Sequence, residues 1–497
     1  MSKSIEKYFH ESFDKEAGLF HAGKRTKIVA TVGPACNTFD KLLDLVKAGV
    51  NVFRLNFSHG EHSEKATIIE YVRQINKEHP YNIAILADLQ GPKLRVGALE
   101  NDKVVLTPGE TLYITTEKCI GTKEQIFVSY PNLQNDIKIG EKIMFDDGKL
   151  EVLVTAISDT GVIETKILIG GDLLPKKGMN LPDTAISLPA LTEKDLKDLD
   201  FAIAQKVEWI ALSFVRKTED ILDLKRRIKA VNSKCKVIAK IEMPEAIKNL
   251  RDIIVESDAI MIARGDLGVE LPVEEVPLIQ KDIIKKCIHR GKPVIVATQM
   301  MESMIDRTKP NRSEITDVAN AVLEGTDAVM LSGETATGMH PTLVVETMTK
   351  IILEIERKAY NFDTTDNGLG AQQKSPSFMS DATCYAAAKL ATTVNATALV
   401  GMTQSGYTAF MLSSVRPKPP LYIFTKERTL VNQLSLSWGV RAFFYNEEES
   451  LDDIIDDQIA ILKHRGFINS GDIVVNTGST PIASHLPTNL IKISKVD

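Results

Sequence analysis

Short hydrophobic runs alternate with amphipathic segments along most of the chain. Eight of these runs are rich in β-branched residues, and the stretches between them carry apolar residues at helical spacing. The runs occupy residues 26–33, 51–58, 82–89, 208–215, 236–242, 259–268, 293–300 and 328–335. Runs that are apolar almost throughout are typical of parallel strands buried on both faces. Eight such strand–helix units predict a (β/α)8 TIM barrel, an α/β fold.

One long interval interrupts this alternation. From Gly91 to Leu188 the helical period disappears, and short alternating segments separated by turns predict a small all-β domain inserted into the barrel. The insertion leaves after the third strand and returns before the fourth, so its two joints flank the expected mouth of the barrel. We therefore expect a lid over the active site. A passive decoration of the barrel is the alternative.

A second domain is predicted at the carboxyl end of the chain. A polar stretch at residues 361–377 predicts a linker, and apolar runs at 398–403, 420–425, 440–445 and 472–478 alternate with helical segments. These features predict a separate, doubly wound α/β domain. The predicted organisation is an N-terminal extension (1–20), the barrel in two parts (21–90 and 189–358), the β lid (91–188) and the C-terminal α/β domain (359–497).

Composition and charge exclude several classes of protein. The chain has 497 residues, enough for several domains, with 60 Lys plus Arg against 66 Asp plus Glu. This balance gives no sign of nucleic-acid binding, and no apolar run is long enough to cross a bilayer. The amino end lacks the apolar core of a signal peptide, so we expect a cytoplasmic protein. The five cysteines are widely spaced, and we expect inert thiols.

The fifth and sixth runs end in residues suited to a metal ion. Alternate side chains of a strand share a face, so Lys240 and Glu242 point the same way. If the two strands are parallel neighbours, Glu242 and Asp266 emerge close together at their carboxyl ends, where α/β folds place their chemistry. Two carboxylates with substrate oxygens and water suit Mg²⁺. Gly265 would let a ligand approach the backbone, and we expect Arg264 to orient a neighbouring carboxylate.

Either acid alone would be consistent with an ordinary surface residue, but further polar residues gather at the same predicted rim. The second run places three residues that can bind phosphate or cations on one face, and other runs end in an acid or a hydroxyl. These residues are Arg54, Asn56 and Ser58 with His59 just beyond, Asp88, Ser213 and Thr298. Such a concentration of charge and hydroxyls indicates a functional site rather than packing.

Five sequence strings carry a family resemblance: R-L-N-F-S-H-G at 54–60, K-I-E at 240–242, A-R-G-D-L-G-V-E at 263–270, A-T-Q-M-M-E-S-M at 297–304 and M-L-S-G-E-T-A at 330–336. Together they resemble the pyruvate kinases. The resemblance implies phosphoryl transfer from phosphoenolpyruvate to ADP, giving pyruvate and ATP in the last step of glycolysis. It also implies dependence on Mg²⁺ (or Mn²⁺) and a homotetramer.

The resemblance assigns roles to residues position by position. It makes Glu242 and Asp266 the Mg²⁺ ligands and Lys240 the group that stabilises the transition state. The implied catalytic set is Lys240, Arg54, Thr298 and Arg95; the implied substrate-binding set is Arg54, Ser213, Lys240, Gly265, Asp266 and Thr298; the implied nucleotide-binding set is Arg95, Lys177, Asn56 and His59. A metaphosphate-like group needs cations around it, which the metal ion, Lys240, Arg54 and Arg95 would supply. Whether Lys240 or a water near Thr298 protonates enolpyruvate stays open.

One departure from the family pattern concerns K⁺. Asn56, Ser58 and Asp88 match the family's monovalent-cation ligands, but the fourth position is Leu89, which offers only its backbone carbonyl. Lys93 stands where K⁺-requiring members carry glutamate. A K⁺ ion beside its ammonium would meet a repulsion of about 4 kcal/mol at about 4 Å with an effective dielectric constant of about 20. We therefore expect Lys93 to act as a tethered cation and the enzyme to work without K⁺. A solvated lysine on the hinge is the alternative.

The C-terminal domain carries a candidate effector site. Thr403, Gln404, Ser405, Gly406 and Thr408 follow a predicted strand and open a helix, where hydroxyls and backbone N–H groups can hold a phosphate. Gln404 and Tyr407 stand where many relatives carry Lys or Arg, so we expect a different effector or none.

Two other functional classes fit parts of the pattern. A metal-dependent aldolase or lyase acting on a pyruvate-type substrate would also place acids at barrel strand ends, but it would not need basic residues on a lid. A non-catalytic metabolite sensor would keep the C-terminal pocket, although the presence of Lys240, Glu242 and Asp266 argues against it.

Overall fold

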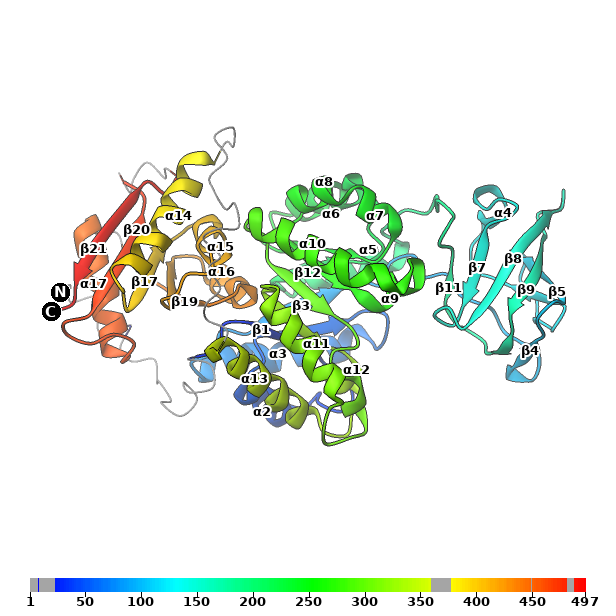
Figure 1. Cartoon of the computed structure of the whole chain (residues 1–497), viewed down its shortest axis with the longest axis horizontal. Helices are drawn as coiled ribbons and strands as arrows, with labels where there is room; N and C mark the ends of the chain where they lie inside the picture. The colour runs from blue at the N-terminus through cyan, green and yellow to red at the C-terminus, as the bar shows by residue number, and fades with distance from the viewer. Residues whose placement is uncertain (1–7, 9–22, 359–376, 448, 481–486) are drawn as a thin grey trace.

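Three bodies lie in a row along the molecule, with the barrel between the C-terminal domain and the lid (Figure 1). The computed structural model describes Tyr8 and residues 23–358, 377–447, 449–480 and 487–497. The predicted N-terminal extension and the predicted linker therefore lie outside the described residues, apart from Tyr8 and Ser377. No helix within the described ranges is long and apolar enough to cross a membrane.

The central body is a closed barrel of eight parallel strands, which confirms the predicted fold. Its strands, in chain order, are β1 (Lys27–Thr31), β2 (Val52–Asn56), β3 (Ala84–Asp88), β12 (Trp209–Leu212), β13 (Lys236–Ile241), β14 (Ala259–Ala263), β15 (Val294–Ala297) and β16 (Ala328–Leu331). The helices that accompany them are α2 (Phe39–Ala48), α3 (His62–Glu78), α5 (Glu193–Ala204), α6 (Thr218–Ala230), α7 (Pro244–Lys248), α8 (Leu250–Glu256), α9 (Arg264–Glu270), α10 (Val276–His289), α11 (Arg312–Leu323), α12 (Gly333–Ala336) and α13 (Pro341–Lys358).

Local signals in the sequence set several helix ends. The Thr192 side chain accepts a hydrogen bond from Asp195 N, and the Asp195 carboxylate accepts from Thr192 N, so α5 begins with a capping box. Gly291 follows α10 with a φ of 62°, a left-handed conformation suited to glycine. The segment that follows β13 forms two helices, α7 and α8, that meet at Asn249.

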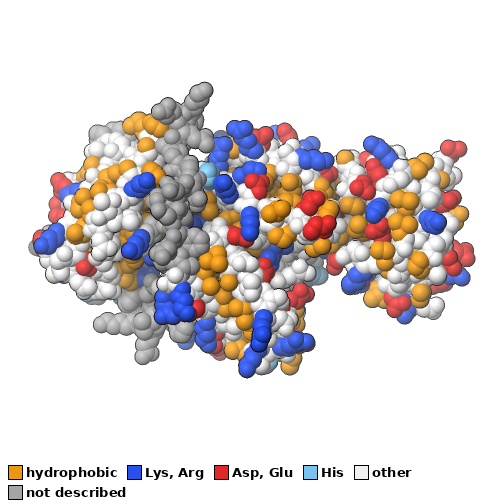
Figure 2. Space-filling model, viewed as in Figure 1, with side chains coloured by type: hydrophobic (Ala, Val, Ile, Leu, Met, Phe, Trp, Pro, Cys, Tyr) orange, Lys and Arg blue, Asp and Glu red, His pale blue; other side chains and the backbone are white. Residues whose placement is uncertain are grey.

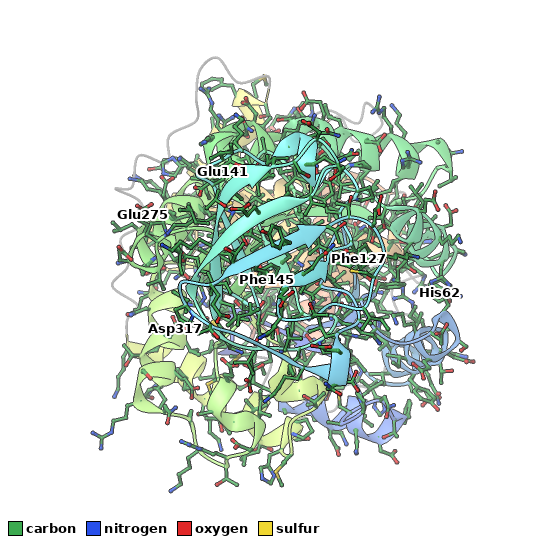
Figure 3. All side chains as sticks on the ribbon, turned by 90° about the vertical axis from the view of Figure 1, so that its right-hand side faces the viewer. His62, Phe127, Glu141, Phe145, Glu275 and Asp317 are labelled. Carbon is green, nitrogen blue, oxygen red and sulfur yellow. The ribbon has the colours of Figure 1, made fainter. Side chains whose placement is uncertain are left out.

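The lid is built from strands between β3 and β12, as predicted. A six-stranded sheet contains β11 (Met179–Asn180), β7 (Lys142–Phe145), β8 (Leu150–Ile157), β9 (Ile163–Ile169), β5 (Thr111–Thr115) and β6 (Gln125–Phe127), and a two-stranded sheet pairs β10 (Gly171–Leu173) with β4 (Val104–Leu106). A short helix, α4 (Leu133–Asp136), lies between β6 and β7. The lid has its own hydrophobic core, which includes Tyr130 and Phe145. Seen from the lid end, its sheet lies in front of the barrel (Figure 3).

The C-terminal domain is a five-stranded sheet covered on both faces. Its order is β19 (Val440–Phe444), β18 (Leu421–Thr425), β17 (Ala398–Met402), β20 (Ile473–Gly478) and β21 (Leu490–Lys495), and only β21 runs antiparallel. The sequence analysis missed β21, because Lys492, Ser494 and Lys495 interrupt its apolar residues. The helices are α14 (Phe378–Thr393), α15 (Tyr407–Ser414), α16 (Arg428–Gln433) and α17 (Leu451–His464).

The C-terminal domain closes the amino end of the barrel. Leu436 packs in the same hydrophobic cluster as the barrel-interior residues Trp209 and Met261. The Trp209 indole N–H donates to Gln433 O at 3.3 Å, and Lys27 Nζ donates to Val440 O at 2.9 Å. The open end of the barrel is therefore its carboxyl end, toward the lid.

Candidate active site

The period-two alternation of the strands collects charged side chains at the carboxyl end of the barrel. Val52, Leu86 and Ile238 belong to the interior cluster, so residues two positions further along the same strands, Arg54, Asp88 and Lys240, face the interior as well. In the barrel order β2, β3, β12, β13 and β14 are consecutive neighbours. The predicted rim residues therefore lie along one continuous arc.

Lys240 is the centre of this arc. Its Nζ lies 2.8 Å from Glu242 Oε1 and 3.3 Å from Asp88 Oδ1, and it donates to Ser213 Oγ at 2.8 Å. Ser213 Oγ donates in turn to Leu89 O at 2.7 Å. The structure thus brings together four residues from three strand ends around one buried ammonium group.

Arg54 extends the cluster to the next strand. Its Nε lies 2.6 Å from Asp88 Oδ2, and its guanidinium donates to Thr31 Oγ1 at 2.9 Å. Thr31 was not among the predicted site residues, although it ends the first strand on the face of Val29, an interior residue. The same parity rule that selected Arg54 would have found it.

Burial and charge act against each other on these groups. Burial alone would lower the pKa of Lys240, but the carboxylates of Asp88 and Glu242 outweigh it and raise that pKa above its ordinary value. Burial would raise the pKa of Asp88, but Lys240 and Arg54 lower it. For Glu242 burial prevails, so its pKa is raised, with Asp266 adding to the effect and Lys240 opposing it. The rim therefore holds fixed positive charge beside carboxylates ready for a further cation.

Asp266 lies on a helix rather than on a strand end. It occupies the first turn of α9, which begins directly after β14. Its charge acts on both Glu242 and Lys240, so it is close to the rim cluster. Gly265 N donates to Thr298 Oγ1 at 2.8 Å, which joins the start of α9 to the end of β15. Thr298 and Gln299 both adopt left-handed backbone conformations, with φ of 69° and 55°.

Arg264 differs from expectation. It forms an ion pair with Asp317 on α11, at 2.6 Å, and donates to the carbonyls of Ala297 and Thr298. It therefore orients no metal-ligand carboxylate and instead fixes the junction of α9 with β15 and α11.

The residues of the predicted monovalent-cation pocket lie at neighbouring strand ends, where Asn56 of β2 pairs with Asp88 of β3. Asn56 Oδ1 accepts a hydrogen bond from Ser58 N at 3.0 Å, and Asp88 is held by Arg54 and Lys240. The Leu89 side chain is buried in the cluster between strands and helices, on the opposite face from Asp88, so only its carbonyl reaches the rim. Lys93 lines a small cavity with Asp266 and lowers the pKa of His59, for which burial is the larger cause.

The two basic lid residues are placed differently. Arg95, like Lys93, lowers the pKa of His59, so its charge lies within reach of the rim, and its guanidinium donates to Lys176 O at 2.8 Å. Lys177 instead pairs with Asp146 of the lid at 2.7 Å. The geometry therefore connects Arg95 with the rim, whereas Lys177 has its ion-pair partner within the lid.

The sequence analysis also missed Glu270, the last residue of α9. Its carboxyl group is buried and accepts a hydrogen bond from Asn180 of the lid at 2.7 Å. Burial raises its pKa to about 7, and the nearby charges of Glu245 and Asp266 act in the same direction. The A-R-G-D-L-G-V-E string contains it, but its position four residues beyond Asp266 gave no separate signal.

The candidate effector residues border a cavity of about 580 Å³ in the C-terminal domain. Thr403, Gln404, Ser405 and Thr408 line it together with Ser380, Gln458 and Thr477, whereas Gly406 caps α15 beside it and donates to Thr403 Oγ1 at 3.1 Å. The described lining contains hydroxyls, amides and apolar side chains and neither Lys nor Arg.

Comparisons with known proteins agree with this architecture. The barrel domain of pyruvate kinase matches residues 23–345, and the alpha/beta domain of pyruvate kinase matches residues 381–494. A pyruvate kinase of Geobacillus stearothermophilus is 41% identical over 95% of this chain and 80% of its own length. One from Corynebacterium glutamicum is 40% identical over 95% of this chain and 97% of its own. The crystal structure of a pyruvate kinase from Cryptosporidium parvum superposes with a TM-score of 0.90 at 34% identity and covers 99% of each chain.

The barrel, its inserted lid and the charged rim define a phosphotransferase. The chain belongs to the pyruvate kinase family. Its reaction is the glycolytic transfer of a phosphoryl group from phosphoenolpyruvate to ADP, which leaves pyruvate. The family assignment sets aside the lyase and sensor alternatives.

Proposed function

We propose that the cluster around Lys240 is the site of phosphoryl transfer and that Glu242 and Asp266 hold the Mg²⁺ or Mn²⁺ ion. The observation that carries this proposal is the buried ammonium of Lys240, bonded to Asp88, Ser213 and Glu242 at the carboxyl ends of adjacent strands. A fixed cation there meets the charge that develops on the transferred phosphoryl group.

The donor set fits a hard divalent cation. Glu242 is almost fully buried, and its pKa is raised, so its carboxylate gains from a further positive charge. No group of three or more His, Cys, Asp or Glu within the described ranges would hold a metal ion by itself. Two protein carboxylates completed by substrate oxygens and water match the way in which Mg²⁺ binds at phosphoryl-transfer sites. The bound ion would act as a Lewis acid on phosphoryl oxygens.

The remaining roles are those that the family resemblance implies. Arg54 is fixed by Asp88 and Thr31 and contacts the transferred phosphoryl group, while Gly265 and Thr298, already hydrogen-bonded to each other, bind the pyruvate moiety. Lys240 or a water molecule beside Thr298 would supply the proton to enolpyruvate. Arg95, Lys177, Asn56 and His59 form the nucleotide side of the site.

We further propose that the enzyme works without added K⁺, with Lys93 as a tethered cation. Leu89 turns its side chain away from the rim, and Lys93 already places positive charge near His59. A homotetramer is proposed from the family resemblance, and the glycolytic reaction supports a cytoplasmic location.

The C-terminal cavity is proposed to bind a phosphorylated effector through hydroxyls and backbone N–H groups. Because its described lining lacks cations, we expect a singly phosphorylated ligand rather than a bisphosphate. Thermal-shift screening of sugar monophosphates, sugar bisphosphates and nucleotides tests this, with a Thr403→Ala, Ser405→Ala variant as control. Absence of any shift specific to the unmodified protein would contradict the proposal.

One assay tests the main proposal. Pyruvate formation from phosphoenolpyruvate is measured with and without ADP and with and without Mg²⁺ or Mn²⁺. We expect turnover only when both ADP and the metal are present. Turnover that persists after exhaustive chelation would contradict the assigned metal site.

A further inference from the structure

A small cavity of about 30 Å³ lies where the lid meets the barrel. In the space-filling view the molecule is narrower at this junction than on either side of it (Figure 2). Residues of the lid joint, including Asn180, line the cavity from one side, and Asp266 and Glu270 of α9 line it from the other. The cavity therefore lies between a lid strand, β11, and α9, the helix that carries the proposed metal ligand.

Several hydrogen bonds cross this junction: Arg216 donates to Ile186 O and Leu188 O of the lid joint, and Asn180 bonds to α9. Asn180 Nδ2 donates to Glu270 Oε1 at 2.7 Å, while Glu270 Oε2 is buried and has no partner among the described residues. A buried carboxylate that is only half satisfied is unusual for a purely structural contact and is costly to keep. An apolar residue would fill the same space without that cost, so the polar pair calls for a functional explanation.

Asn180 belongs to β11 of the lid and Glu270 to α9 of the barrel, so a movement of one element can displace the other. Asn180 is paired with Met144 in the lid sheet and follows the segment in which Met179 N donates to Leu94 O and Val96 N to Lys177 O. Both chain segments of the lid joint are thus tied to each other and to β11. Glu270 ends α9, a helix of two turns whose first turn carries Gly265 and Asp266. A displacement of β11 that preserves the hydrogen bond must move the helix as well.

We propose that Asn180 and Glu270 are positioning residues that couple the position of the lid to the placement of Asp266 and Gly265. The proposal rests on Asp266 being a metal ligand, as proposed above. Neither residue needs to touch a substrate, because their effect passes through β11 on one side and α9 on the other. Lid position and metal affinity then change together.

The test compares Asn180→Ala, Glu270→Ala, their double variant and Glu270→Gln in the full-length chain. Affinity for Mn²⁺ alone is measured by electron paramagnetic resonance.

Lid position is measured as the distance between two spin labels. One label is on Cys119, an exposed cysteine of the lid, and the other is on Arg226→Cys, an exposed position of α6, in a Cys235→Ser background. Lys103→Ala, which breaks an exposed ion pair within the lid, is the matched control.

We expect each alanine variant to weaken Mn²⁺ binding about tenfold, a typical loss for a group one shell removed from the metal, and to broaden the label distance. The double variant should be no worse than either single variant, because both remove the same hydrogen bond. Glu270→Gln keeps an acceptor for Asn180 and should restore the unmodified behaviour. At saturating metal and substrate, kcat should stay within about twofold while KM rises.

Additive losses, or an unchanged distance distribution in Asn180→Ala, would overturn the proposal. If Glu270→Ala fails to fold, Asn180→Leu decides: it nearly keeps the side-chain volume but removes the donor, and should match Asn180→Ala in both measurements. Asp266→Asn separates this inference from the function on which it rests. Normal Mn²⁺ affinity in that variant would refute the ligand assignment, whereas loss there with no response at Asn180 would refute only the coupling.

Discussion

The two ends of the barrel both bury lysines, but they treat the charge in opposite ways. At the carboxyl end Lys240 lies between Asp88 and Glu242, and its pKa is raised. At the amino end Lys24 and Lys27 are also buried, and burial lowers their pKa values to about 7 and about 8. Lys24 donates to Asn51 Oδ1, and Lys27 to a backbone carbonyl, and the charges of Glu356 and, for Lys27, Asp327 do not outweigh burial.

The comparison shows that burial alone does not identify a functional lysine. Desolvation is the largest influence on all three groups, and the neighbouring charges decide whether the ammonium is kept. A lysine held charged by two carboxylates is prepared for electrostatic stabilisation of a transition state. A lysine with neutral partners is a structural element that reduces stability when it is protonated.

Lys240→Met should give the largest effect on activity. Loss of the fixed cation should lower kcat about a thousandfold, with little change in affinity for phosphoenolpyruvate. Lys27→Met, at the other end, should leave kcat near that of the unmodified enzyme and change only the unfolding midpoint. Steady-state kinetics and denaturant titrations on both variants test whether Lys240 is catalytic and Lys27 structural. Equal losses of kcat in the two variants would contradict this difference in role.

Asp266→Asn should weaken metal binding on the order of 100-fold, because a charged ligand is lost. Asp317→Asn is the matched control. Asp317 pairs with Arg264, which belongs to the same sequence string as Asp266, and it is not a proposed metal ligand. Mn²⁺ titration without substrate measures both. A larger loss in Asp317→Asn than in Asp266→Asn would mean that the roles of the two acids are reversed.

Lys93→Glu should make turnover depend on K⁺ by about tenfold, since it replaces the ammonium with a carboxylate that can bind a monovalent cation. The unmodified enzyme should show little response to KCl when assayed in tetramethylammonium buffers. Strong K⁺ activation of the unmodified enzyme would show that Lys93 is only a solvated lysine.

The smallest expected effect is a pH dependence of stability. An unfolded lysine has a pKa of about 10.4, so between about pH 7 and pH 10 the unfolded chain binds more protons than a folded chain whose Lys24 has a pKa of about 7. Stability contributed at this position should therefore rise with pH across that window. The denaturation midpoint of the unmodified protein should increase from pH 7 to pH 9 relative to Lys24→Met. If the denaturation midpoints of the two proteins changed with pH in parallel, the lowered pKa of Lys24 would be contradicted.

The sequence was sufficient for the barrel because its strands are apolar on both faces, and sufficient for much of the rim because side chains alternate along a strand. The sequence pattern placed Lys240 and Glu242 on one face of a strand, and in the structure Lys240 Nζ lies 2.8 Å from Glu242 Oε1. It failed where contacts join distant elements. Arg264 pairs with Asp317, 53 residues away, and Asn180 with Glu270, 90 residues away, and no local period reports such pairs. The strand β21 was missed because an exposed edge needs no hydrophobic run.

Thr298 and Gln299 limit how far this enzyme can be stabilised. Two successive non-glycine residues in the left-handed region each cost the folded state free energy, of order 1 kcal/mol or more. Gln299→Gly or Thr298→Gly would relieve that strain. At Thr298, however, the hydroxyl that holds Gly265 would be lost with it. Selection for heat resistance would therefore be expected to accept changes at Gln299 and to reject them one residue earlier, so that the trade-off between stability and activity is set within a single dipeptide.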